Sequence, residues 1–255
     1  MDLKLFFDPL DDSQFDSTTH SPTSFYSNIH ANVEQMPSLD GMEIARIGVP
    51  ESRGSARNMG TEFAPDQIRR KLYGLKKGFG TYKIIDLGNL RPGHNLDETH
   101  GRLTEVCRFL LEKNLLPLII GGSQDLDYAQ YKGYEDLEKL VSVLNVDAFM
   151  DMDEDAEFMD LNHIQKILLH DPNYLFHYCH LAYQSYLIDQ KTLDVVEMLG
   201  FESHRLGKLR TNFEEVEPVI RSADMLTFDI SALKSADAPA SINAQPFGLT
   251  GEEAC

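Results

Sequence analysis

The feature that most constrains the fold is an alternation of apolar runs and amphipathic stretches that begins near residue 43. The apolar runs are near-continuous, which is typical of strands buried on both faces. They span residues 43–49, 82–88, 115–122, 140–147, 174–180 and 224–231. Helical periodicity occupies residues 64–75, 96–113 and 126–140. The pattern predicts an α/β fold in three layers, α/β/α, with a mostly parallel sheet between the helices.

The N-terminal segment has a different composition. Residues 1–41 are rich in Asp, Ser, Thr and Pro and show no sustained period, so we expect an irregular extension there. Residues 42–255 carry the strand and helix pattern. A chain of 255 residues is long enough for one α/β domain with a substantial core. We therefore expect a single domain over residues 42–255.

Composition bears on location and partners. The formal net charge of -18 disfavours nucleic acid, whose binding depends on Lys and Arg. No apolar run approaches the roughly 20 residues that a membrane span requires, and the first residues are acidic where a secretory signal would be basic. We expect a cytoplasmic protein without a membrane partner. The three cysteines, Cys107, Cys179 and Cys255, include no CxxC pair and are interpreted as reduced packing thiols.

Carboxylates gather where the predicted strands end. Asp147 and Asp151 follow one strand, and Asp229 lies near the end of another. The carboxyl ends of parallel strands lie at one rim of a sheet, where ligands bind. Three converging carboxylates resemble a site for a hard cation such as magnesium, calcium or manganese. The alternative is that these residues cap helices or face water.

Several segments, in order, resemble the ureohydrolases, the family of arginase, agmatinase and formimidoylglutamase. They are IGVPESRGSARNMGTEFAPDQIRRKL, IIDLGNL, LPLIIGGSQDLDYA, VLNVDAFMD, LTFDISALKSADAPA and PFGLTGEE. The resemblance covers residues 42–255, and HLAYQSYL at 180–187 is most similar to the formimidoylglutamase branch. It implies the same α/β fold. It also implies a further helix and strand beyond the motif within which this sequence stops.

The resemblance also implies a metal site and shows where this chain departs from it. In the family, the motifs GGDHS, DAHxD and SxDxD supply six ligands to two manganese ions. Asp147, Asp151 and Asp229 keep three of these ligand positions. Gln124, Phe149 and Ser231 occupy the other three, and both histidines are among those lost. We therefore expect one weak manganese site or none, and no organic cofactor.

Three further residues have two interpretations each. The resemblance places Glu253 where the family binds the cationic end of a substrate, but Thr250 and Glu253 also fit a capping box. His163 is the one nearby candidate for the family's proton-shuttling histidine, although its surroundings read as a helix without a family match. Lys234 either replaces metal charge by pairing with Asp229 or Asp151, or points into solvent.

Three functions remain open from the sequence. The first is a ureohydrolase homologue with a degenerate dimetal site and weak or no hydrolase activity. The second is a metal-dependent hydrolase of carbon–nitrogen bonds in linear amidines, with a small amidine or guanidine as substrate. The third is a non-enzymatic interaction module. Family members often assemble as homo-oligomers, and such an assembly is an expectation for this chain as well.

Overall fold

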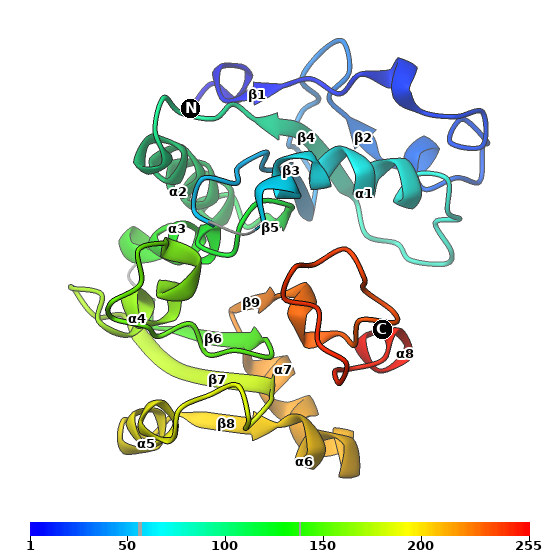
Figure 1. The fold of residues 1–255 in the computed structure, drawn as a ribbon. Helices are drawn as coiled ribbons and strands as arrows, with labels where there is room; N and C mark the ends of the chain where they lie inside the picture. Colours follow the sequence, from blue (N-terminus) through cyan, green and yellow to red (C-terminus); the bar gives the residue numbers. More distant parts are fainter. Residues whose placement is uncertain (56–57, 138) are drawn as a thin grey trace. The chain divides into compact units, whose positions relative to one another are not determined.

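The computed structural model describes residues 1–55, 58–137 and 139–255. The chain forms two compact units, Met1–Leu137 and Glu138–Cys255, and each contains one hydrogen-bonded sheet (Figure 1). All six predicted strands are present, and both sheets are mostly parallel, as the apolar runs indicate. Residues 56 and 57 of the first family-like segment lie outside the described residues, as does residue 138 of the helix predicted at 126–140.

The first unit is built on three parallel strands. They are β3 (Ile44–Gly48), β4 (Ile84–Leu90) and β5 (Leu116–Ile120), with β3 in the middle. The helices are α1 (Ala64–Leu72), α2 (Leu96–Glu112) and α3 (Leu126–Lys132). Helix α2 begins at an N-cap, because the Asn95 side chain accepts a hydrogen bond from the backbone N–H of Glu98. Its inner face packs Leu103, Val106 and Leu110 into the core.

The N-terminal segment consists mainly of short turns and loops that lie along the first sheet. Two strands of two residues, β1 (Phe7–Asp8) and β2 (His30–Ala31), both pair with β4. Leu3 and Phe7 are buried in the core of this unit. The pairing and the buried side chains anchor a segment whose sequence has no period.

The second unit contains a four-stranded parallel sheet. Its strands are β6 (Val141–Val146), β7 (Leu175–Tyr183), β8 (Glu202–Arg205) and β9 (Met225–Phe228), in the order β8-β7-β6-β9. The helices are α4 (His163–Leu168), α5 (Gln190–Met198), α6 (Leu206–Thr211), α7 (Glu217–Ser222) and α8 (Gly251–Ala254). Leu144, Leu181, Leu206 and Leu209 belong to its apolar core. Strand β6 lies inside the sheet, so its carboxyl end is flanked by strands on both sides.

A buried ion pair strengthens the first unit. Arg69 in α1 and Asp86 in β4 are both fully buried, and the guanidinium Nε and Nη2 donate to the two carboxylate oxygens at 3.0 and 2.9 Å. Arg69 also donates to Asn89 and to the carbonyl of Gly88. Because charges this deep must be paired and hydrogen-bonded, the pair fixes the position of α1 against β4.

Across the residues that the structure describes, no helix is both long and apolar enough to cross a membrane.

Candidate metal site

Two of the predicted ligand residues are brought together by the register of β6 and β9. Val146, the last residue of β6, pairs with Phe228, the last residue of β9, so Asp147 and Asp229 follow at the same level of the sheet. The backbone N–H of Asp229 donates to the carbonyl of Val146 at 2.9 Å. The expectation that carboxylates meet at one rim is correct for this pair.

Asp147 is buried, with 1% of its surface exposed, and one of its carboxylate oxygens is held by two donors. The hydroxyl of Ser231 donates to Oδ1 at 2.5 Å, and the backbone N–H of Phe149 donates to the same atom at 3.0 Å. Ser231 is equally buried. The hydroxyl of Ser231 therefore donates its proton to the Asp147 carboxylate.

Asp151 joins the same cluster through an unusual backbone conformation. Its φ of 44° lies in the left-handed region, which Asp adopts more readily than most residues. Burial raises the pKa of Asp151 well above its ordinary value. The neighbouring carboxylates of Asp147, Asp229 and Asp160 and a hydrogen bond with Asp147 act in the same direction. Crowding of these carboxyl groups therefore disfavours the ionised form of Asp151.

Asp229 completes the trio. Burial raises its pKa, although the backbone N–H of Ser231, which donates to Oδ1 at 2.6 Å, opposes the shift. Ser231 therefore binds both Asp147 and Asp229, one through its hydroxyl and one through its backbone. A serine fits this space by hydrogen bonding and adds no further negative charge.

The supporting residues beneath Asp147 were not identified from the sequence. His180 on β7 is fully buried, and burial lowers its pKa to about 4, so the ring is neutral. Its Nε2 lies 3.1 Å from the carbonyl oxygen of Asp147, and its Nδ1 lies 2.9 Å from the hydroxyl of Tyr178. A neutral ring that donates from Nε2 and accepts at Nδ1 satisfies both contacts and holds the Asp147 backbone. The sequence signal for this arrangement is only the spacing of Tyr178 and His180.

Gln124 lies in the first unit, on the turn that follows β5. Gly121 and Gly122 have φ angles of 80° and 85°, and a Cβ on Gly121 would lie 2.5 Å from the ring of Pro65. Ser123 donates its backbone N–H to the carbonyl of Glu51 at 3.0 Å. The double glycine therefore sets the sharp turn that presents Gln124 at the carboxyl end of its strand.

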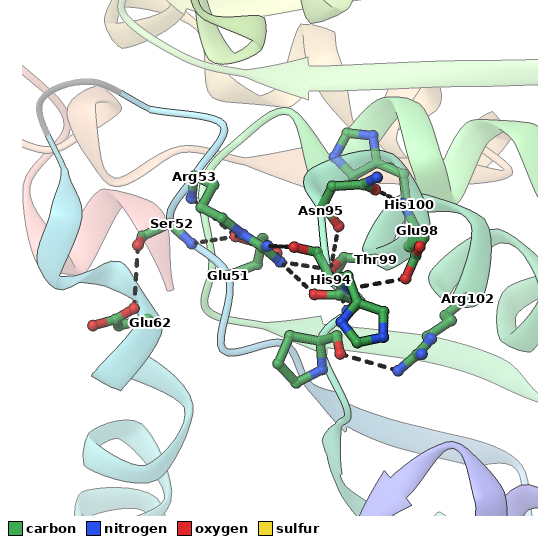
Figure 2. A network of polar contacts seen from close by, with 12 residues as sticks. Glu51, Ser52, Arg53, Glu62, His94, Asn95, Glu98, Thr99, His100 and Arg102 are labelled. Atoms are coloured by element: carbon green, nitrogen blue, oxygen red, sulfur yellow. Dashed lines mark hydrogen bonds and ion pairs between the residues drawn. The ribbon is translucent and has the colours of Figure 1, made fainter.

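A polar network next to this turn was also missed (Figure 2). The buried carboxylate of Glu51 accepts from Nε and Nη2 of Arg53 at 2.9 and 2.6 Å. Arg53 also donates to the carbonyls of Gly93 and His94 and to the hydroxyl of Thr99. These bonds join the loop after β3 to the start of α2. The partners lie about 40 residues apart, so no local pattern predicts them.

Glu253 forms the capping box that the sequence allows as an alternative to substrate binding. Thr250 accepts from the backbone N–H of Glu253 at 3.0 Å, and Glu253 Oε2 accepts from the backbone N–H of Thr250 at 2.7 Å. Arg210 in α6 donates to both carboxylate oxygens, at 3.1 and 3.2 Å. These bonds lower the pKa of Glu253, the one from the Arg210 side chain most. The carboxylate is therefore ionised and engaged by partners from its own chain.

His163 and Lys234 have specific places as well. His163 begins α4 as a fully buried residue, and its Nδ1 lies 2.9 Å from the carbonyl oxygen of Asp160. Lys234 lies 3.4 Å from Asp237, and its side chain is 34% exposed. The predicted pairing of Lys234 with Asp229 or Asp151 is therefore wrong, because the nearer partner lies three residues along the same loop.

The donor atoms of the second unit decide which ion the cluster suits. Asp147, Asp151 and Asp229 present only carboxylate oxygens, which suit a hard cation such as manganese. Phe149 is partly buried and has no donor atom in its side chain. The hydroxyl of Ser231 already binds Asp147, so the oxygen donors that this cluster could offer a cation are those of the three carboxylates.

Comparison with known proteins assigns the chain to a family. The family model described as "Arginase family" matches residues 42–255. The chain belongs to the arginase family. A formimidoylglutamase of Corynebacterium efficiens is 27% identical over 129 residues, which is 48% of this chain and 41% of that protein. A formimidoylglutamase of a Geobacillus species is 25% identical over 221 residues, 80% of this chain and 67% of its own length. The chain thus spans about two fifths of the length of the Corynebacterium efficiens relative.

Solved structures confirm the fold. The crystal structure of Trypanosoma cruzi formiminoglutamase with manganese has a TM-score of 0.75 and 21% identity, and the match covers 86% of this chain and 81% of that one. Proclavaminate amidino hydrolase from Streptomyces clavuligerus gives a TM-score of 0.75 at 17% identity. The predicted arginase-like α/β fold is therefore correct.

Proposed function

We propose that this arginase-family protein holds one manganese ion weakly at Asp147, Asp151 and Asp229 and has little or no hydrolase activity on linear amidines. The proposal rests on the three retained ligand positions and on the substitutions at Phe149 and Ser231 in the same unit. It is supported by the geometry of the carboxylate cluster in the second unit.

The single observation that carries the proposal is the 2.5 Å hydrogen bond from the Ser231 hydroxyl to Asp147 Oδ1. With the backbone N–H of Phe149 on the same atom, that oxygen already has two donors. A carboxylate oxygen so engaged has little capacity to bridge a second cation. Phe149 removes another ligand position outright. A site for a pair of ions would need both positions.

The chemistry of this family depends on the pair. When bound, manganese ions supply the positive charge that makes water nucleophilic at neutral pH and that orients the substrate. In this chain, three carboxylates supply negative charge and oxygen donors for one ion. Asp229 and Asp147 are held by Ser231, and His180 holds the backbone of Asp147. These contacts hold two of the three carboxylates that the proposal assigns to one cation.

The experiment is a manganese titration of the full chain by calorimetry, after elemental analysis of the purified protein. We expect at most one equivalent of manganese, lost in Asp147→Asn and retained in the matched control Asp155→Asn, an exposed residue. Activity on formimidoylglutamate, agmatine and arginine should be absent or very low at saturating manganese. Two bound equivalents, or turnover comparable to a typical hydrolase, would overturn the proposal.

A second candidate function is that of a metal-dependent hydrolase of carbon–nitrogen bonds in linear amidines. The observation that favours it is the retention of carboxylates at three of the family's ligand positions, Asp147, Asp151 and Asp229. Such an enzyme would lose its activity with a chelator and regain it with manganese. A chelator-sensitive reaction that Asp229→Asn abolishes, at unchanged far-ultraviolet circular dichroism, would establish this function. Chelator-insensitive background hydrolysis would exclude it.

A further inference from the structure

Strands β7 and β8 lie side by side in the sheet of the second unit (Figure 1) and carry a second group of side chains of metal-ligand type. In the parallel register, Cys179 pairs with Glu202 and Leu181 pairs with His204. Side chains two residues apart on a strand share a face. Glu202 and His204 therefore project from β8 on the side from which Cys179 projects from β7.

The donor atoms of this group are close enough to share an ion. The Cys179 sulfur, a carboxylate oxygen of Glu202 and an imidazole nitrogen of His204 all lie within 4.8 Å of one another. His204 Nε2 lies 3.2 Å from Glu202 Oε2. Metal–ligand bonds of about 2.0–2.3 Å in a tetrahedral zinc site place the donor atoms roughly 3.3–3.8 Å apart. The three atoms therefore need only small side-chain rotations to meet one ion.

A fourth residue orients the carboxylate. His177 lies two residues before Cys179, and its Nε2 is 3.4 Å from Glu202 Oε1. The two histidines thus face the two oxygens of one carboxylate. Hydrogen bonds to the free oxygen of a ligating carboxylate are the usual means of fixing its direction.

The Cys179 thiol is buried, whereas Glu202 is open to solvent. Cys179 is fully buried and packs in the apolar core with Leu206 and Leu209 of α6. Burial, and to a lesser degree Glu202, raises the pKa of its thiol to about 12, so without a cation the thiolate does not form at neutral pH. The side chains of Glu202 and His204 are 49% and 15% exposed. An ion can therefore enter from the side of Glu202.

We propose that Cys179, Glu202 and His204 form a binding site for one zinc-type divalent ion, with His177 orienting Glu202. One sulfur, one nitrogen and one oxygen donor are the ligand types of zinc, whereas manganese prefers oxygen alone. A thiolate, a carboxylate and a neutral imidazole balance the ion's two positive charges. The ion displaces the thiol proton of Cys179, which is released to solvent. Water fills the fourth position.

Cobalt(II) tests the site because its absorption spectrum depends on which atoms bind it. Addition of cobalt to the reduced full chain should give a thiolate-to-cobalt charge-transfer band at one equivalent, and one equivalent of zinc should abolish it. The carboxylate cluster of Asp147, Asp151 and Asp229 contains no sulfur and cannot produce this band. The signal therefore does not depend on whether the proposed function is correct.

Variants assign the ligands. His204→Gln and Glu202→Gln replace exposed or partly exposed side chains, and the fold of each is checked by far-ultraviolet circular dichroism. Loss of an outer-shell partner typically costs 10–100-fold in metal affinity, so loss of a ligand should cost at least about 100-fold. The matched control His94→Gln changes an exposed histidine of the first unit and should leave the titration unchanged.

Three results would overturn the proposal. The first is the absence of a charge-transfer band with cobalt in the reduced protein, which would mean that Cys179 does not ligate. The second is a band that survives in both His204→Gln and Glu202→Gln, which would place the sulfur ligand elsewhere, at Cys255 or Cys107. A band that Cys255→Ser removes would have the same meaning.

Discussion

Replacing Ser231 with alanine tests whether its hydroxyl stabilises the carboxylate cluster. The substitution removes a 2.5 Å hydrogen bond to a carboxylate between two residues that are each 1% exposed. Hydrogen bonds to charged groups contribute about 1.5–3 kcal/mol, and the substitution removes one donor from Asp147 Oδ1. The hydroxyl also accepts from the backbone N–H of Ala148 at 3.4 Å, a long contact that adds little. We expect the free energy of unfolding to fall by about 2 kcal/mol.

Urea unfolding at neutral pH measures this change. The chain contains no tryptophan, so far-ultraviolet circular dichroism and tyrosine fluorescence are the signals. With a slope of about 3 kcal/mol per molar urea, the midpoint should move down by roughly 0.7 M. Ser222→Ala is the matched control, because Ser222 is exposed and its hydroxyl donates to the carbonyl of Val219, a neutral group. The reasoning is refuted if Ser231→Ala changes the stability by no more than this control does.

Three further predictions concern other parts of the chain. Restoring the family's ligands within the second unit with Phe149→His and Ser231→Asp together should raise manganese affinity in a calorimetric titration, and an unchanged affinity would count against the assigned ligand positions. Asp86→Asn should lower the free energy of unfolding by about 3–5 kcal/mol, since it breaks a buried ion pair; a loss below about 1 kcal/mol in urea would contradict this. Burial raises the pKa of Glu51, but hydrogen bonds from its arginine partner outweigh this and hold it below the ordinary value of 4.5. The ionised form of Glu51 therefore stabilises the fold above pH 4.5, and this contribution is lost on acidification. Glu51→Gln lacks the titrating group. In urea titrations between pH 7 and pH 3 this variant should therefore lose less stability than the wild type.

The sequence was most informative where strands are buried on both faces. Near-continuous apolar runs predict β6 and β9, and parallel pairing of such strands places Asp147 and Asp229 side by side. Strand β8 was not predicted, because its residues Glu202–Arg205 are all polar and an edge strand needs no apolar run. The two-residue strands β1 and β2 are too short to show any period.

Contacts between distant residues explain the rest of what was missed. The Arg53–Glu51 network reaches α2 across about 40 residues, and the bond between Arg210 and Glu253 spans 43. Cys179 was interpreted as a packing thiol, and it does pack. Its position beside Glu202 depends on the register of a strand that the sequence does not reveal. Spacing along the chain predicts neighbours on one element, whereas these pairs arise from folding.

The bond between Arg210 and Glu253 has a consequence for recognition. The group that Glu253 already holds is itself a guanidinium, tethered to the same unit and bound to both carboxylate oxygens. A tethered group acts at an effective concentration in the millimolar range for a short flexible link. A free guanidinium compound that binds this carboxylate would therefore have to displace the guanidinium of Arg210. Glu253 becomes available only to a ligand that outcompetes Arg210 or to a conformation in which α6 has moved away.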